Sequence, residues 1–277
     1  MIRFLVIGDF NSVLRKSLIK KVEREKFDAV LALGDYGGDK RIGRITFKNW
    51  GKNWEDVVGE KRAKQLLKED YDKSLKILKW LNSLRKSVFF IFGNNDQYKG
   101  NKVKSFEGKN LLKYTKKFKN FKYVHEKTVN FKGTKIYGHG GFVTSDIYLN
   151  KKYAPYDKKK MLKRIREYNK DKKVLLKNKK IDIFLIHYPL YGIFDKINNP
   201  VVKKMHGKKI GFKPYNLAVK KFKPKIVFCS HMEEHSSEKK KYRNSLVVNP
   251  GSALFGRYCF LDFDENKKIV KNVKFCK

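Results

Sequence analysis

Five apolar segments of the sequence end abruptly, each at or beside a residue that can bind a metal ion. The first two run into Gly-Asp pairs, the third into Gly-Asn-Asn-Asp, and the last two into histidines. The metal-binding residues at these ends are Asp9, Asp35, Asn94, His187 and His231. One Gly-Asp pair is ordinary turn chemistry, but turns do not readily explain five such ends in one chain. The pattern therefore indicates metal-dependent chemistry at a shared site.

The segment that carries Asp35 shows how such residues would be positioned. Residues 30–39 read VLALGDYGGD, which predicts a buried strand whose glycines let the backbone turn away after the carboxylate. The carboxyl edge of a sheet is where α/β proteins place their sites. After the first Gly-Asp pair, residues 12–26 show helical spacing with Ser12 as the expected N-cap, and residues 29–33 return to the sheet. The chain thus begins as a βαβ unit.

The rest of the sequence continues the alternation of helices and strands. An amphipathic pattern over residues 61–86 predicts a helix that covers a sheet face. Residues 122–137 alternate in polarity, which predicts a hairpin with Gly133 in its turn. The later elements that we expect are a short helix near 217–222 and strands at 246–248, 258–263 and 269–275.

Length and composition narrow the class of protein. With 277 residues, 41% of them hydrophobic and no Pro-, Ser- or Gly-rich linker, we expect residues 1–277 to form a single domain. Three cysteines without paired spacing suit a reducing compartment. No apolar run approaches the roughly 18 residues that span a bilayer, and the N-terminus lacks a signal-peptide pattern. These features predict a cytoplasmic protein without a membrane partner.

The net charge of +40 arises from 67 basic and 27 acidic residues. Such a chain attracts polyanions, of which nucleic acid is the commonest inside a cell, so nucleic acid is an expected partner. The alternative is that codon bias enriched lysine, because only eleven of the 67 basic residues are arginine. Adaptation to high temperature explains the high lysine content less well, since the glutamate content usually rises together with the lysine content in that case.

Two segments differ from the rest of the chain in amino-acid composition. Residues 39–60 form a cap insertion in which cations alternate with Phe47, Trp50 and Trp54. Its rings could stack on bases while its cations hold phosphates; alternatively, it is a small cap whose tryptophans pack on the main body. Residues 156–180 are a Lys-rich helical insertion, whose charges form either a solvated face or a surface that tracks phosphates.

The ordered motifs Gly-Asp, Gly-Asp, Gly-Asn-x-Asp, a lone His after a strand and a final His-x-acid resemble the calcineurin-like metallophosphoesterases. The resemblance runs from residue 2 to about 263 and includes the runs IHYPLYGIFD, KPKIVFCSH and VVNPGS. In detail the chain is similar to the small prokaryotic and archaeal phosphoesterases of that superfamily. The resemblance implies an α/β fold, namely a four-layer α/β/β/α sandwich of two mixed sheets flanked by helices.

The resemblance also implies two divalent metal ions bridged by Asp35. Two ions about 3.5 to 4 Å apart neutralise phosphate oxygens and make water nucleophilic. One site would take Asp35, Asn94, His187 and His231, a set that suits Mn, Fe, Zn or Co better than Ca.

The second metal site departs from the family pattern at two positions. The family has Asp-x-His where this chain has Asp9-Phe10-Asn11, and it has Gly-His-x-His where this chain has Ser-His-Met-Glu, ending at Glu233. The site would therefore hold Asp9, Asp35, Glu233 and, as a further candidate, Asn11. Oxygen donors alone favour Mn or Mg over Zn, and weak occupancy or an empty site is the alternative. If the last loop bulges, His235 would replace Glu233.

A third departure concerns catalysis. The family usually has Gly-Asn-His-Asp, in which the histidine protonates or stabilises the leaving oxygen, and Asn95 stands in its place here. An amide donates a hydrogen bond but delivers no proton, and loss of a general acid typically costs about 10²- to 10⁴-fold in rate. Some small prokaryotic members also lack that histidine, so the change does not by itself predict inactivity. Asp96, which would orient the donor, would then brace the turn.

These features lead to one main hypothesis and two alternatives. The main hypothesis is a metal-dependent phosphodiesterase that uses a metal-bound hydroxide, with Mn as the expected metal and nucleic acid or a nucleotide as substrate. The first alternative is a catalytically impaired protein of the same fold that binds nucleic acid. The second is a phosphomonoesterase for small metabolites, in which the cap insertion is only a lid. The sequence leaves the oligomeric state open.

Overall fold

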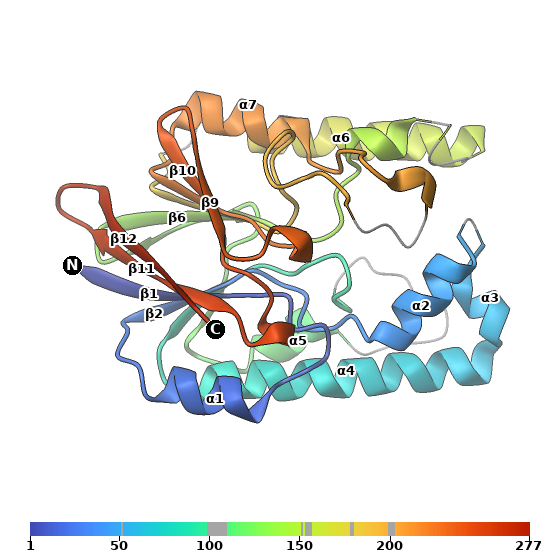
Figure 1. Cartoon of the computed structure of the whole chain (residues 1–277), viewed down its shortest axis with the longest axis horizontal. Coiled ribbons are helices and arrows are strands. Elements are labelled where there is room, and N and C mark those ends of the chain that lie inside the picture. The colour runs from blue at the N-terminus through green and yellow to red at the C-terminus, as the bar shows by residue number, and fades with distance from the viewer. Residues whose placement is uncertain (51, 99–109, 151, 153–156, 178–179, 199–202) are drawn as a thin grey trace.

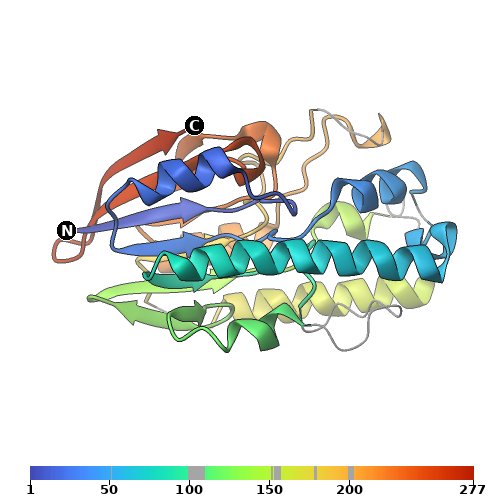
Figure 2. The same ribbon diagram turned by 90° about the horizontal axis from the view of Figure 1, so that it is seen from below.

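The computed structural model describes residues 1–277 with the exception of 51, 99–109, 151, 153–156, 178–179 and 199–202. Two six-stranded sheets lie face to face, and helices cover the outer face of each sheet (Figures 1 and 2). Both sheets mix parallel and antiparallel pairs. The predicted fold class, a four-layer α/β/β/α sandwich, is therefore confirmed.

The first sheet has the strand order β12-β11-β1-β2-β3-β4. Its four strands from β1 to β4 are parallel, β11 is antiparallel to β1, and β12 is antiparallel to β11. The N-terminal strand therefore pairs with a strand from the C-terminal part of the chain. The strands are β1 (Ile2–Ile7), β2 (Ala29–Ala32), β3 (Ser87–Phe90), β4 (Phe121–Tyr123), β11 (Tyr258–Asp264) and β12 (Ile269–Cys276).

The second sheet has the strand order β5-β6-β7-β8-β10-β9. Strands β6, β7, β8 and β10 are parallel, and the two edge strands are antiparallel to their neighbours. The strands are β5 (Thr128–Phe131), β6 (Thr134–His139), β7 (Ile183–Ile186), β8 (Ile226–Phe228), β9 (Glu238–Tyr242) and β10 (Ser245–Asn249).

Helices form the two outer layers. The layer over the first sheet consists of α1 (Lys16–Glu23), α4 (Glu60–Ser83) and α5 (Leu111–Thr115), and the layer over the second sheet consists of α6 (Lys158–Leu175) and α7 (Lys213–Phe222) (Figure 1). Helices α2 (Lys40–Lys48) and α3 (Trp54–Val58) project beyond the sheets beside the N-terminal part of α4 (Figure 2). The 3-10 turns are η1 (Asp146–Leu149), η2 (Lys203–Met205), η3 (Glu233–His235) and η4 (Ala253–Phe255).

Three apolar layers hold these four layers together. Strand β1 shows the reason, because its side chains alternate between two faces. Phe4 and Val6 point into the apolar cluster between the sheets, whereas Leu5 and Ile7 point into the cluster beneath α1 and α4. A third cluster, which includes Phe184 and Tyr215, lies beneath α6 and α7. None of the helices in the described ranges is both long enough and apolar enough to cross a membrane.

Two local predictions from the sequence were wrong. Ser12 does not cap α1, because α1 begins only at Lys16. The backbone of Ser12 has a left-handed φ of 63°, and the Ser12 hydroxyl donates to Asp70 on α4. The segment 122–137 is not a single hairpin either. Its first part is β4, which pairs with β3 in the first sheet, so only β5 and β6 form the hairpin. The aromatic contact between Phe90 and Phe121 lies at that pairing.

The two insertions are helical. The cap insertion contains α2 before residue 51, which lies outside the described residues, and α3 after it. The Lys-rich insertion contains α6, which is shorter than the predicted stretch; residues 156 and 178–179 of that prediction lie outside the described residues. Both insertions extend past the carboxyl edges of the sheets, on opposite outer layers (Figure 1).

Glycines let the strand ends of the first sheet approach closely. Gly34 follows β2 with a φ of +92°, and a Cβ built on it would lie only 2.2 Å from the backbone nitrogen of Gly93. A left-handed φ and a contact with neighbouring backbone both exclude a side chain. The Gly-Asp and Gly-Asn motifs thus allow Asp35 and Asn94 to leave adjacent strands at nearly the same point.

We expect Gly34→Ala to destabilise the protein by about 2 to 4 kcal/mol, because backbone rather than a flexible side chain must move. The matched control is Gly43→Ala on α2, where a Cβ would meet nothing within 4 Å; it should be neutral or stabilise by up to about 1 kcal/mol. Chemical denaturation of both variants measures the difference. Equal stability of the two variants would contradict the proposed packing.

Candidate metal centre

The loops that follow β1, β2, β3, β7 and β8 meet at the carboxyl edges of the two sheets. These loops carry Asp9, Asp35, Asn94, His187 and His231, respectively. The two sheets are joined directly at this edge, since Nδ1 of His187 lies 3.0 Å from the carbonyl oxygen of Leu33. Residues that are far apart in the sequence therefore converge where parallel strands end.

One cluster contains the four residues predicted for the first metal site. Ligand atoms of Asp35, His187 and His231 all lie within 4.8 Å of one another. Nε2 of His187 lies 2.9 Å from Oδ1 of Asn94 and 3.5 Å from Oδ2 of Asp35. The ring of His231 stacks on Tyr188 at 4.0 Å between centroids, which fixes its orientation. The structure thus brings one carboxylate, one amide and two imidazoles together.

The backbone at this edge is strained at the candidate ligands themselves. Asp9, Asn11, Asp35 and His231 have left-handed φ values of 53°, 47°, 52° and 68°. Each such residue other than glycine costs on the order of 1 to 3 kcal/mol and persists only where the surroundings fix it. Here the N–H of Asp9 donates to the carbonyl of Gly34, and the N–H of His231 donates to Oδ2 of Asp9. Concentrated strain of this kind is typical of functional sites.

Asp9 provides the test of whether a cation fits. Its Oδ2 accepts the N–H of His231 at 2.9 Å, whereas its Oδ1 is buried without a hydrogen bond of normal geometry among the described residues, with Nδ1 of His187 at 4.0 Å and Ser230 nearby. Burial raises the pKa of Asp9 to about 7, despite the opposing charge of His187. A buried carboxylate oxygen without a donor is costly unless a cation compensates it. The residues present therefore fit a divalent metal ion beside Asp9.

Glu233 lies beside Asn11 at the second site. The side-chain amide of Asn11 donates to Oε1 of Glu233 at 2.5 Å, and the hydroxyl of Ser252 lies 3.3 Å from the same oxygen. Burial raises the pKa of Glu233. His235 is directed elsewhere, because its Nε2 lies 3.2 Å from the carbonyl of Lys196. In the structure Glu233 thus lies beside Asn11 and Ser252, whereas the ring of His235 faces the backbone of Lys196.

The electrostatics of the site are dominated by buried charges of opposite sign. Burial favours neutral His187, but Asp35 and Asp9 outweigh burial and raise the pKa of His187 to about 9. Burial and the nearby charge of His187 lower the pKa of His231 to about 3. Burial also disfavours ionised Asp35, yet its pKa is lowered, because His187 and the backbone N–H of Asn95 stabilise the carboxylate. The pocket thus compensates its carboxylates with positive charge, which a metal ion would also supply.

The two residues predicted to be catalytic have different roles in the structure. The backbone and side-chain N–H groups of Asn95 donate to the two oxygens of Asp35 at 2.9 and 2.7 Å. Asp96 is buried and accepts backbone N–H groups from Asp35, Gly37 and Gly93 at 2.7 to 2.9 Å. Burial and the charge of Asp35 raise the pKa of Asp96 to about 7. Asp96 therefore holds the turns in place, whereas Asn95 donates hydrogen bonds to Asp35, the predicted bridging carboxylate.

Sequence analysis missed two residues that position the site. Ser252 donates to the carbonyl of Asp9 at 2.7 Å and links it to Glu233; the run VVNPGS contains this serine and was the available signal. Asp70 is buried on α4 and accepts the N–H groups of Gly38 and Asp39 at 2.9 Å, which holds the loop after the second strand. Nothing in the sequence distinguished this aspartate from the polar residues around it.

The cap insertion is fastened at its start by an ion-pair network. Asp39 accepts two hydrogen bonds from the guanidinium of Arg41 and one from Lys73 on α4, at 2.7 to 2.9 Å. Beyond this network neither α2 nor α3 has a fully buried residue. Phe47, which is 43% exposed, stacks on Trp50 at 6.0 Å with an angle of 5° between the rings. The described part of the insertion therefore carries an aromatic pair in which Phe47 is exposed and Trp50 is half-buried.

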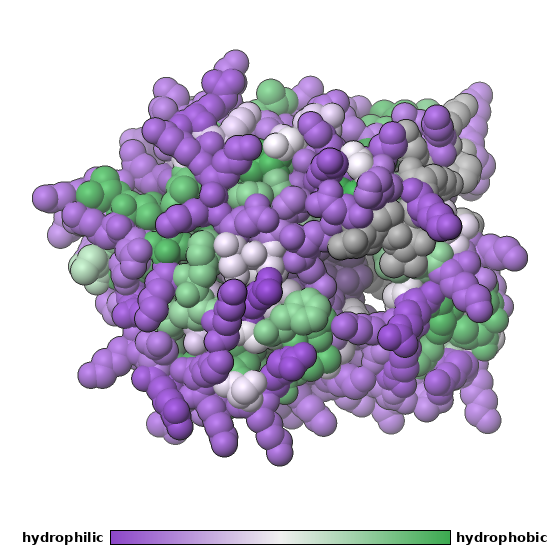
Figure 3. All heavy atoms as spheres, in the orientation of Figure 1, coloured by the Kyte–Doolittle hydropathy of each residue, from purple (hydrophilic) through white to green (hydrophobic). Residues whose placement is uncertain are grey.

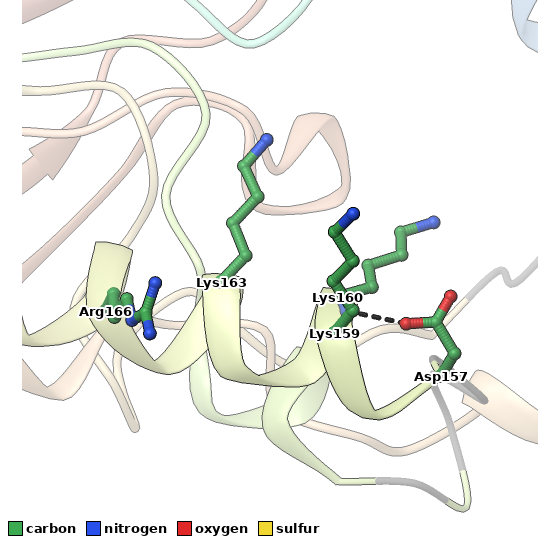
Figure 4. A pocket seen from close by; sticks show the side chains of 5 residues that line it. All are labelled: Asp157, Lys159, Lys160, Lys163 and Arg166. Atoms are coloured by element: carbon green, nitrogen blue, oxygen red, sulfur yellow. Dashed lines mark hydrogen bonds between the residues drawn. The ribbon is translucent and has the colours of Figure 1, made fainter.

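The visible face of the molecule is mainly hydrophilic (Figure 3). A shallow hollow of about 480 Å³ lies on the first half of α6 (Figure 4). It is lined by Asp157, Lys159, Lys160, Lys163 and Arg166. None of the candidate metal ligands lines it, so this hollow is a basic surface feature and not the metal centre.

A family model described as "Metallophosphoesterase, calcineurin superfamily" matches residues 5–273. This chain belongs to that family. Metallophosphoesterases of this superfamily bind two divalent metal ions, and the converging carboxylates and imidazoles at the sheet edge provide candidate ligands. A comparison with curated protein sequences gave no match.

Solved structures with the same fold include distant relatives. One crystal structure has a TM-score of 0.63 and 18% identity, covering 99% of this chain and 98% of its own. The structure of TT1561 from Thermus thermophilus has a TM-score of 0.53 and 15% identity, covering 100% and 98%. The phosphopantetheinyl hydrolase of Mycobacterium tuberculosis has a TM-score of 0.50 and 12% identity, covering 91% and 90%. At these identities the likeness supports the fold alone.

Proposed function

We propose that this protein is a metal-dependent phosphoesterase that hydrolyses phosphodiesters. One observation carries the proposal: Asp35, His187 and His231 place ligand atoms within 4.8 Å of one another, beside Asp9, whose buried Oδ1 lacks a hydrogen bond of normal geometry among the described residues. Family membership supports the same class of chemistry. The substrate, the metal and the activity are the parts that we propose.

The residues divide into two candidate ligand sets. Asn94, His187 and His231 would hold one cation, Asp9 and Glu233 would hold the other with Asn11 beside them, and Asp35 would contact both. When bound, two divalent ions would neutralise the phosphate oxygens and lower the pKa of a water molecule. Because the second set offers oxygen donors, we propose Mn as the metal, with Mg as the nearest substitute.

Asn95 limits the substrates that can be hydrolysed quickly. Its side-chain amide donates to Asp35 and can donate a hydrogen bond to a substrate oxygen, but it has no proton to transfer. The chain therefore provides no general acid at the position where the family usually has histidine. Esters whose leaving oxygen is already stable, such as aryl esters, should react much faster than alkyl esters.

The direct test is turnover of bis(4-nitrophenyl) phosphate by the purified protein in Mn, in Mg and with chelator. We expect hydrolysis that depends on the metal, and a loss of roughly 100-fold or more in Asp35→Asn, which removes the shared ligand. Asp262→Asn on β11 is the charge-matched control and should retain full activity. Metal-independent turnover, or an active Asp35→Asn variant, would refute the proposal.

The same experiment separates the two alternatives. A catalytically impaired binder would bind polynucleotide with a steep salt dependence, show no Mn-stimulated hydrolysis and bind equally well as Asp35→Asn. A phosphomonoesterase would hydrolyse 4-nitrophenyl phosphate faster than the diester.

Replacing Asn95 by histidine should restore a proton donor. General acid catalysis contributes about 10²- to 10⁴-fold, so we expect Asn95→His to accelerate an alkyl diester by at least about 10-fold and an aryl diester little. Asn95→Gln retains the amide and is the matched control. A wild-type protein that hydrolyses both ester classes equally fast would disprove the role assigned to Asn95.

We also propose that the natural substrate is nucleic acid. The cap insertion supports this because the exposed ring of Phe47 stacks on the half-buried Trp50 among the cations of α2, and base stacking on aromatic rings tolerates any sequence. The basic hollow on α6 adds lysines that could contact phosphates (Figure 4). Both features lie on the insertions that extend past the sheet edge.

Binding of a fluorescent single-stranded oligonucleotide tests this proposal. Stacking contributes about 1 to 3 kcal/mol per base, so Phe47→Ala and Trp50→Ala should each weaken binding by roughly 5- to 100-fold without changing its salt dependence. Ile269→Ala removes an exposed apolar side chain on β12 and serves as the control. If all three variants bind alike, the cap insertion does not stack on bases.

A further inference from the structure

A second group of potential metal ligands lies outside the active site. Ligand atoms of Glu126, His139 and Asp171 all lie within 4.8 Å of one another. Glu126 precedes β5, His139 ends β6, and Asp171 is on α6. His139 is 2% exposed, and the two carboxylates are partly buried. The three residues connect the second sheet to the helix that covers it.

The strand register separates this group from the active site. His139 pairs with Ile186 across β6 and β7, and the side chain of Ile186 belongs to the apolar cluster beneath α6 and α7. His187 follows Ile186 and therefore points to the opposite face, where it meets Asp35. The two groups thus lie on opposite faces of the same sheet and share no residue.

Neighbouring groups orient His139 as in a metal ligand. Nδ1 of His139 lies 2.9 Å from the hydroxyl of Tyr215, and that hydroxyl lies 3.4 Å from the carbonyl of His139. If Tyr215 donates to the carbonyl, it accepts the proton on Nδ1, so Nε2 carries the lone pair. Nε2 is the nitrogen that faces Glu126, at 4.0 Å from Oε1. Metal-ligating histidines typically have their second nitrogen fixed in this way.

His125 supports Glu126 in a similar way. The N–H of Gly140 donates to Nδ1 of His125 at 3.0 Å, so a neutral ring has its proton on Nε2. That nitrogen lies 3.5 Å from Oε1 of Glu126. The ring of His125 also contacts the ring of His139, at 5.1 Å between centroids. His125 therefore positions the carboxylate and does not add a fourth ligand.

Two carboxylates at this separation repel each other when both are ionised. A divalent cation between the carboxylates would remove the repulsion. Ligand atoms about 2.0 to 2.2 Å from a tetrahedral zinc ion lie about 3.3 to 3.6 Å apart, so the three groups, now within 4.8 Å of one another, would move closer together around the ion.

Helix α6 has few fully buried residues. Of its 18 residues only Met161 and Leu175, near its two ends, are buried. The helix also contacts α7 and η1. Asp171 lies between the buried ends of the helix, one turn after Tyr168, whose ring contacts Phe212 at 5.4 Å between centroids, so a metal bond at this position would add a polar attachment to the apolar ones.

We propose that Glu126, His139 and Asp171 bind one divalent transition metal ion, of the zinc type, that fastens α6 to the second sheet. Two carboxylates and one imidazole suit Zn or Mn, with solvent in any remaining position. This ion would be structural and additional to the active-site pair. The proposal does not depend on the proposed phosphoesterase activity.

Crossed variants test the site through zinc content after loading and gel filtration. Glu126→Gln combined with Asp171→Asn should lose about one zinc per chain relative to wild type and retain hydrolysis. Glu167→Gln, which removes a neighbouring carboxylate on α6, is the matched control and should lose none. Asp35→Asn should lose active-site metal but retain the ion at α6, with a visible Co²⁺ absorption that disappears when Glu126→Gln and Asp171→Asn are added to Asp35→Asn. Equal zinc in the double variant and Glu167→Gln would overturn the site.

Trypsin digestion reports on the proposed fastening, because α6 is rich in lysine. In Asp35→Asn, zinc should slow cleavage within residues 158–175 by roughly 10-fold or more. The same zinc concentration should give no protection when Glu126→Gln and Asp171→Asn are added. Circular dichroism of each variant confirms that it is folded. Zinc that binds without protecting α6 would overturn the structural role.

Discussion

The buried contact between Asp35 and His187 is the interaction on which the site depends. Each residue belongs to a different sheet, and the atoms that face each other are 3.5 Å apart. Ionised groups are expensive to bury unless each is compensated, and here Asn95 satisfies both oxygens of Asp35 while the carbonyl of Leu33 lies against the other nitrogen of His187. The contact therefore forms only when the two sheets are held in one relative position.

The fold supplies that relative position by ending parallel strands at a common edge. Glycines without side chains let the turns after β2 and β3 touch, and left-handed residues then direct the polar side chains inward. Asp70 and Asp96 hold these turns by accepting backbone N–H groups. Several backbone positions of the candidate ligands are thus strained, and the packing of the apolar layers compensates for this strain.

Departures from the family pattern change the expected chemistry without disturbing the fold. Asn11 and Glu233 form a hydrogen-bonded pair where the family has two imidazoles, so the second site is richer in oxygen and in negative charge. Asn95 contacts Asp35 in place of a general acid. These departures are the basis for the metal and the substrate class that we propose.

The sequence by itself determined the candidate ligands at the strand ends, because apolar runs that end in metal-binding residues are a local pattern. The fold class followed from the resemblance of the ordered motifs to the calcineurin-like metallophosphoesterases. The sequence did not determine the capping of α1, the sheet to which β4 belongs, or the surroundings of Glu233 and His235, since each depends on which distant segment lies beside it. Ser12 meets Asp70 and β4 meets β3 only after the chain has folded. Tertiary structure alone also brought Glu126, His139 and Asp171 together, because their spacing in the sequence has no period that would reveal a shared site.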